Sequence, residues 1–156
     1  MTKIAMAAIV AALTAAAAAS AAPIPEGGVT VDDVAEALQA QGYKAEIGRD
    51  QMGDPMITSA LEGASFRVLF YDCERGRCAA IQFATAFDLK DGLTLSEINS
   101  WNRQRRFGRA YLDDEMDPFV EYDVDLEAGA TTEAIENAVE VWEAVVPHFI
   151  RHIGMD

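Results

Sequence analysis

The fold is decided by residues 66–87, which read FRVLFYDCERGRCAAIQFATAF. In the first half, Phe66, Val68 and Phe70 recur at every second position, which is typical of a β-strand with one buried face. Residues 78–87 show a similar alternation of large and small or polar side chains. Because only a short polar segment separates the two halves, they predict a β-hairpin within an antiparallel sheet.

Outward from this hairpin, the spacing of apolar residues predicts a single α+β domain. Three helices are expected: one at 31–41, one from Thr94 or Ser96 to Arg105, and one that starts at Thr131 or Thr132. The further expected strands are 43–47, 56–61, 109–113 and 118–126. The order is one helix, four strands, one helix, two strands and one helix, with the helices packed on a mostly antiparallel sheet. Pro147 has no N–H to donate to the carbonyl of Glu143, so the last helix should kink or end there.

The first residues have the features of a cleavable secretory signal peptide. Lys3 precedes an uncharged run from Ile4 to Ala22, and the small residues Ala19 and Ala21 suit cleavage after Ala21. An uncleaved membrane anchor is the alternative, because the run is long enough to span a bilayer, but no basic cluster follows to stop transfer. We therefore expect a periplasmic or secreted protein without a stable membrane anchor after cleavage.

The expected organisation is a signal peptide (1–21), a short linker (22–29), one domain (30–151) and a C-terminal tail (152–156). The whole chain has 12 basic and 26 acidic residues, a formal charge of −14. Cleavage removes one Lys and no acid, so the mature chain carries −15. This acidity argues against a nucleic-acid binder, which needs a basic surface. Two Cys and two His are too few for a zinc module.

Cys73 and Cys78 flank a four-residue turn in the predicted hairpin. Cross-strand neighbours in an antiparallel pair lie close enough for a disulfide, and an exported compartment favours oxidation. We therefore expect a structural disulfide that fixes the register of the hairpin. A redox switch or a C-x4-C metal site is the alternative, although no further Cys remains to complete a metal site.

Residues 113–127 contain eight acids and no basic residue. Asp113, Glu115 and Asp117 have the spacing of the first ligands of a calcium loop. Pro118 stands where an EF-hand requires Gly, and the Glu of its last position is missing, so an EF-hand is excluded. Weak binding of a divalent cation remains the alternative to a solvated sheet face whose charge is relieved by nearby Arg.

The chain has one cluster of basic residues, Arg103, Arg105, Arg106 and Arg109. We expect these side chains to neutralise the acidic strand that follows, within the fold or across a dimer, and an anionic ligand or acidic partner is the alternative. His148 and His152 have a metal-ligand spacing. Because the H-E-x-x-H motif is absent, we expect a frayed polar C-terminus there instead.

The chain carries no recognised catalytic motif. A G-x-S-x-G elbow, a P-loop and a G-x-G-x-x-G loop are all absent, and neither Cys has the sequence context of a nucleophile. The sequence therefore predicts a non-catalytic protein with no cofactor. A hydrolase that uses acidic residues or His148 is kept as the alternative.

The most distinctive stretch runs from Glu97 to Leu126 and reads EINSWNRQRRFGRAYLDDEMDPFVEYDVDL. It contains a W-N-x-x-x-R-F core, followed by A-Y-x-D and a strand with polar residues on one side. The core residues, called the signature residues below, are Trp101, Asn102, Arg106 and Phe107. This pattern resembles the YbjN domain family, and the preceding strand pair with its two Cys is similar to the exported branch of that family. The turn Asp-Asp-Glu-Met-Asp departs from the family, where a Gly is common.

The resemblance covers about residues 28–150 and implies a fold similar to class I type III secretion chaperones. Those are small, acidic α+β proteins that bind other chains and often dimerise. The family offers no catalytic residue to carry over. We expect Trp101 and Phe107 in the core, and we expect Asn102 and Arg106 to bond the backbone of the turn into the next strand. A functional role of these four signature residues, as an interaction site, is the alternative. The predicted function is an exported, non-catalytic module, chaperone-like or regulatory, that binds another protein, with a homodimer as one implied state.

Overall fold

The computed structural model describes residues 22–127 and 130–155. In chain order its elements are α1 (Val31–Ala40), β1 (Glu46–Arg49), β2 (Pro55–Leu61), β3 (Ala64–Glu74), β4 (Arg77–Ala86), α2 (Leu95–Gln104), β5 (Arg109–Leu112), β6 (Pro118–Asp125) and α3 (Thr132–His152). The predicted α+β class and the predicted order of helices and strands are confirmed.

One antiparallel sheet contains the six strands, in the order β1-β2-β3-β4-β6-β5. Strands β3 and β4 therefore stand at its centre, and β1 and β5 form its edges. Their register places Val68 opposite Phe83 and Tyr71 opposite Ala80. Since residues directly opposite each other share a face, each face of the hairpin carries the set of residues that the sequence alternation predicts.

The turn of the central hairpin is tighter than the sequence suggests. The predicted four-residue turn is wrong, because Glu74 and Arg77 pair across the strands and leave only Arg75 and Gly76 between them. Both turn residues have positive φ, 53° and 81°, as a two-residue type I′ turn requires. Cys73 lies directly opposite Cys78, and the two form the predicted disulfide.

The first two helices begin at capping boxes. At α1, the Thr30 hydroxyl accepts the N–H of Asp33, while the Asp33 carboxylate accepts the N–H of Thr30. Thr94 and Glu97 make the same reciprocal pair at α2, which selects Thr94 over Ser96 as the cap. The side-chain hydrogen bond from Thr94 lowers the pKa of Glu97.

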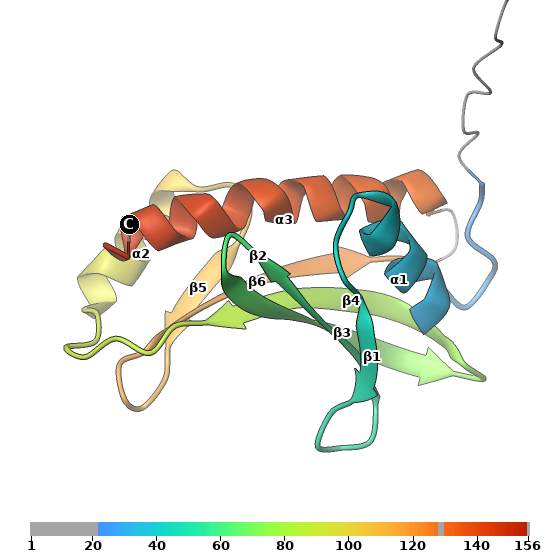
Figure 1. The fold of residues 1–156 in the computed structure, drawn as a ribbon, viewed down its shortest axis with the longest axis horizontal. Helices are drawn as coiled ribbons and strands as arrows, with labels where there is room; N and C mark the ends of the chain where they lie inside the picture. The colour runs from blue at the N-terminus through green and yellow to red at the C-terminus, as the bar shows by residue number, and fades with distance from the viewer. Residues whose placement is uncertain (1–21, 128–129, 156) are drawn as a thin grey trace, which may run out of the picture.

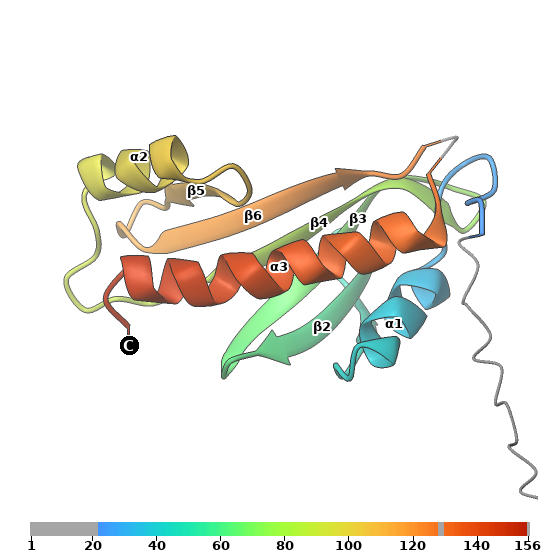
Figure 2. The same ribbon diagram turned by 90° about the horizontal axis from the view of Figure 1, so that it is seen from above.

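The helices leave one face of the sheet uncovered. Figure 1 shows α3 lying along one face, with α1 at the same side of the sheet. Helix α1 contacts α3, and α2 contacts the edge strand β5, beside which it lies in Figure 2. No helix of the described residues covers the opposite face of the sheet (Figure 1).

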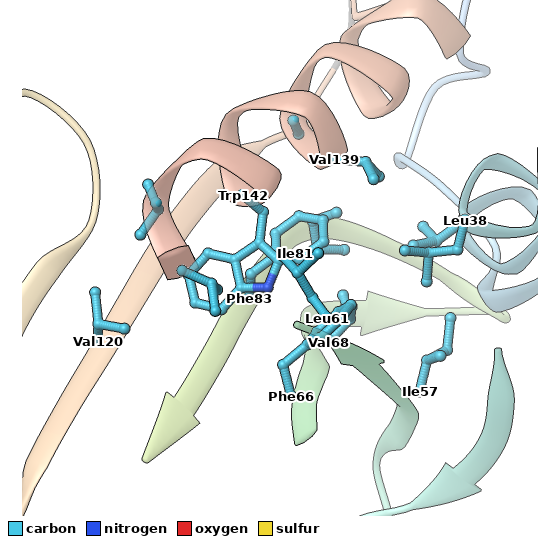
Figure 3. Packing of buried hydrophobic residues seen from close by; sticks show 14 of the residues in the cluster. Leu38, Ile57, Leu61, Phe66, Val68, Ile81, Phe83, Val120, Val139 and Trp142 are labelled. Carbon is cyan, nitrogen blue, oxygen red and sulfur yellow. The ribbon is translucent and has the colours of Figure 1, made fainter. Parts of the chain in front are cut away.

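The core lies between α3 and the central strands. The predicted apolar seam of α3 is buried, and its members are Ile135, Ala138, Trp142, Val145 and Phe149. Figure 3 shows the Trp142 ring entering the cluster beside Phe83. Its centroid lies 5.7 Å from that of Phe83 and 6.0 Å from that of Phe66, the spacing of favourable aromatic pairs.

Helix α3 does not end at Pro147. It continues to His152, so of the two expected effects of Pro147, a kink or an end, the end of the helix is wrong. Phe149 and Ile153 beyond the proline are buried, and this tertiary packing offsets the one lost backbone hydrogen bond. Within the described ranges, no helix combines the length and the apolar character that crossing a membrane requires.

Residues 22–29, which the sequence places before the domain as a linker, lie against it. Val29 is fully buried and exchanges backbone hydrogen bonds with Cys78. Pro23 forms a second bridge with Thr131. At Gly28, φ is +90° and a Cβ would lie 1.9 Å from the carbonyl oxygen of Cys78, so only glycine allows this approach.

We expect Phe83→Ala to lower the free energy of unfolding by about 3–5 kcal/mol, because it opens a cavity beneath Trp142. Urea unfolding followed by tryptophan fluorescence measures the loss. Phe107→Ala is the matched control: Phe107 is 43% exposed and Phe83 fully buried, so the control should lose less than about 1 kcal/mol. Equal losses in the two variants would contradict the assigned core.

Candidate functional site

Trp101 joins α2 to the end of α3. Its indole Nε1–H donates to the carbonyl oxygen of Gly108 at 2.6 Å, and its ring centroid lies 4.9 Å from that of Phe149. The side chain is 1% exposed, so its predicted place in the core is confirmed. Because the only polar atom of the indole is bonded to the chain itself, the ring contributes an apolar surface at this position.

Asn102 bonds the backbone of the next strand, as predicted. Its side-chain N–H donates to the carbonyl of Ala110, and its oxygen accepts the N–H of Ala110, both at 2.9 Å. The amide thus occupies the place of a residue on a neighbouring strand. Ala110 belongs to the edge strand β5, so this side chain closes that edge in the middle of the strand.

The predictions for Phe107 and Arg106 are wrong. Phe107 is exposed, because it lies in the loop between α2 and β5, with its ring edge-on to Tyr122. Arg106 makes no hydrogen bond to the turn within the described residues; its guanidinium lies over the Phe107 ring, 5.4 Å from the centroid. The Asn102 amide already bonds both polar groups of Ala110, which leaves Arg106 free to point outward.

Three of the four signature residues line one groove. This α2–α3 groove has a volume of about 590 Å3. Its lining residues come from α2, the following loop and α3: Trp101, Arg105, Arg106, Phe107, Asn137, Glu140, Val141, Ala144, Val145 and His148. The sequence stretch that carries the family resemblance thus forms one wall of the groove, and α3 forms the other.

Gly108 sets the width of the groove at one end. Its φ is +78°, and a Cβ there would lie 2.7 Å from Cγ1 of Val145. The absence of a side chain therefore lets the loop approach α3 closely. Sequence reasoning identified one wall through Trp101 and Phe107 but missed the α3 wall, since Val145 was assigned only to the apolar seam.

The Arg cluster divides into paired and unpaired members. Arg109 forms an ion pair with Glu121 at 2.8 Å, which confirms the predicted neutralisation for this residue. Arg103, Arg105 and Arg106 form no ion pair with any described carboxylate, so neutralisation within the fold is wrong for them, and neutralisation across a dimer stays a prediction. Arg105 instead lies over the ring of Trp101, 5.3 Å from its centroid.

The uncovered face of the sheet forms a second candidate surface, called the open face. Its residues alternate along the strands with the core residues and include Met56, Thr58, Arg67, Leu69, Tyr71, Ala80, Gln82, Ala84, Ala86, Arg109, Tyr111, Phe119, Glu121, Asp123 and Asp125. Tyr71 and Tyr111 are 44% and 39% exposed. The Tyr111 ring stacks on Phe119 with centroids 5.1 Å apart.

Hydrogen bonds order the polar part of the open face. Glu121 accepts from Arg109 and from the Tyr111 hydroxyl, both at 2.8 Å. Gln82 donates to Asp123 at 2.7 Å. Burial and the hydrogen bond to Glu121 together raise the pKa of Tyr111 to about 12. The acidic strand is therefore held by specific donors rather than solvated alone.

The acidic turn that suggested a calcium loop orders its own backbone. The Asp113 carboxylate accepts the N–H groups of Glu115 and Asp117, both at 2.9 Å. Asp117 accepts the N–H of Leu89. Among the residues that the structure describes, no group of three or more His, Cys, Asp or Glu side chains is arranged to hold a metal ion.

His148 and His152 contact different parts of the chain. The His148 Nδ1 lies 2.6 Å from the carbonyl oxygen of Ala144. The His152 Nε2 lies 2.9 Å from the carbonyl oxygen of Glu97, and its ring packs beside Trp101. The predicted frayed C-terminus is wrong, because the contacts of His152 fix the last turn of α3 against α2.

Comparison with known families gives one match. The family model YbjN, described as "Putative bacterial sensory transduction regulator", matches residues 30–155. This range contains the signature residues, the α2–α3 groove and the open face. No curated protein matches the chain.

We expect Asn102→Asp to lower the free energy of unfolding by about 1–3 kcal/mol at neutral pH, because the carboxylate would face the carbonyl of Ala110 without a proton to donate. Protonation restores a donor, so the folded state raises the pKa of the introduced carboxyl above the unfolded value of about 3.9. The folded variant then binds more protons than the unfolded one between the two pKa values. Its deficit should therefore shrink as pH falls through that window.

Urea unfolding of the Asn102 variant across pH 4–7 measures this effect. Asn99→Asp is the matched control, since Asn99 is an exposed residue of the same helix with no side-chain hydrogen bond to the described chain. It should change the stability by no more than about 0.5 kcal/mol. A deficit in the Asn102 variant that does not depend on pH would rule out the assigned bonding.

Proposed function

The chain belongs to the YbjN family, and we propose that it is a non-catalytic regulatory module that binds another protein through the open face. The family match supports a regulatory or binding role in the coarse sense. The exposed aromatic residues on a sheet face without a helix cover are the observation that carries the finer proposal.

The composition of the open face supports a protein partner. Interfaces between proteins are enriched in Tyr, Phe, Met and Arg. Aromatic rings at Tyr71, Tyr111 and Phe119 offer large apolar area at a low cost in side-chain entropy. Hydrogen bonds within the face, centred on Glu121, hold the rings in place before a partner arrives. A preordered surface of this kind loses less entropy on binding.

The hydrolase alternative has less support. It needs a pocket in which a carboxyl group is poised as an acid or base. Glu140, the carboxylate that lines the α2–α3 groove, is exposed. The nearby His148 ring lies against the Ala144 carbonyl. Weak cation binding has similarly little support, because Asp113 and Asp117 already accept backbone N–H groups.

We further propose that the protein acts in an oxidising compartment outside the cytoplasm. The signal-like residues 1–21 lie outside the described residues, so the support comes from the sequence pattern and from the disulfide. Disulfides are rare in reducing compartments. We also propose that the fold is similar to that of class I type III secretion chaperones and that the protein forms a homodimer. The family match and the α+β fold support these two proposals.

A photo-crosslinking experiment tests the open face. Tyr71 or Tyr111 is replaced by p-benzoylphenylalanine in the host cell, and adducts are identified by mass spectrometry. We expect one discrete adduct from both positions, because both rings are exposed on the same face. Leu95 on α2, 72% exposed and away from this face, is the matched control and should give no such adduct.

Two outcomes would contradict the proposal for the open face. An adduct at the Leu95 position alone would place the interaction on another surface, and no adduct at either Tyr position would remove its support. An adduct of twice the chain mass would show that a second copy occupies the open face; this would support the homodimer and overturn the proposal of a different protein at this face.

Export predicts a processed and oxidised chain. Intact-mass analysis of the natively expressed protein should give an N-terminus at Ala22 and no free thiol at Cys73 or Cys78. Ala21→Arg is the control, because a large charged residue at the cleavage position should block processing. A wild-type chain that keeps Met1 and carries two free thiols in the cytoplasmic fraction would contradict export.

A further inference from the structure

We propose that the α2–α3 groove binds a small amphipathic carboxylate, with the apolar part of the ligand on the groove floor and its carboxylate at Arg105 and Arg106. This goes beyond the proposed function, because it assigns a ligand site at a surface separate from the open face. The assignment follows from the shape, the lining and the unpaired charge of the groove.

The floor of the groove is apolar and already formed. Trp101 and Val145 are buried beneath it, and its accessible apolar surface comes from Val141, Ala144 and Phe107. The Trp101 indole N–H is bonded to Gly108, so no unpaired polar atom of this ring lies beneath the floor. A volume of about 590 Å3 lies in the range of sites for small ligands, about 300–1,000 Å3.

The loop side of the groove carries two guanidinium groups. Arg105 lies over Trp101 and Arg106 over Phe107, at 5.3 and 5.4 Å from the ring centroids. A guanidinium that lies over an aromatic ring is restrained by this contact. The N–H groups at its edge can still donate hydrogen bonds to a ligand. Neither Arg forms an ion pair within the described part of the chain.

Most basic residues in the described ranges form no ion pair, but Arg105 and Arg106 are the ones that lie over aromatic rings lining the groove. Elsewhere Arg77 and Arg109 pair with Asp33 and Glu121. The two Arg residues beside the apolar floor thus offer their charge to an anion from outside. The planar fork of a guanidinium matches a carboxylate, so the complementary ligand joins an apolar body to one carboxylate.

The α3 side sets the orientation of the ligand. Glu140 lines the groove from α3 and would repel a carboxylate. The head group therefore belongs at the Arg105 and Arg106 side, and the apolar body extends over Val141 and Val145 toward α3. A neutral ligand of the same apolar size should bind less tightly, because such a ligand would leave both guanidinium groups unpaired.

The site is tested by isothermal titration of the mature protein with decanoate, below the micelle concentration of decanoate. Decanol serves as the neutral counterpart. We expect decanoate to bind at least about tenfold more tightly than decanol, the value of one charge-assisted contact. Arg105→Gln/Arg106→Gln should weaken decanoate binding at least about tenfold. Arg103→Gln, on the same last turn but outside the groove, is the matched control and should change it less than twofold.

A second pair of variants separates the groove from general surface binding. Ala144→Trp fills the groove from α3 and should abolish decanoate binding, while Ala40→Trp, at an exposed position of α1, should leave it unchanged. Circular dichroism checks that each variant is folded. No heat at millimolar decanoate, equal affinity for decanol, or full binding by the double Arg variant would overturn the proposal. Crosslinking at the open face is unaffected by any of these outcomes.

Discussion

The packing of Trp142 on the central hairpin is the interaction on which the rest of the fold depends. It joins the longest helix to the two central strands through Phe66 and Phe83. Its indole N–H has no hydrogen-bond partner among the described residues, a cost of about 1–3 kcal/mol that aromatic burial must offset. Once α3 is fixed in this way, Phe149 supports Trp101 near one end, and α1 packs against α3 as well.

The sequence predicted what depends on local spacing. Alternation at Phe66, Val68 and Phe70 and the apolar seam of α3 identified the core face of each element, because a strand or helix presents its period directly in the chain. Features that depend on contacts between distant residues were missed. Val29 is buried because it bridges to Cys78, and α3 passes Pro147 because Phe149 is held by other elements. Neither contact leaves a local pattern.

The candidate site shows the same division. The resemblance selected a stretch that forms one wall of the α2–α3 groove, yet it could not tell which residues turn inward. Trp101 is buried and Phe107 exposed, although both are aromatic residues of one motif, since the chain reverses after Phe107 at Gly108. The α2–α3 groove needs Val145, about forty residues away in sequence, so no single motif contains it.

The Asn102 amide has a consequence for how copies of the sheet can associate. Strand addition requires a free edge, and Asn102 occupies the backbone groups of Ala110 at the β5 edge. The β1 edge is the other end of the sheet. A sheet with one closed end can be extended only from the opposite end, so growth by edge pairing stops at two molecules. One side chain thereby opposes strand pairing at the β5 edge, and with it an endless ribbon built through that edge.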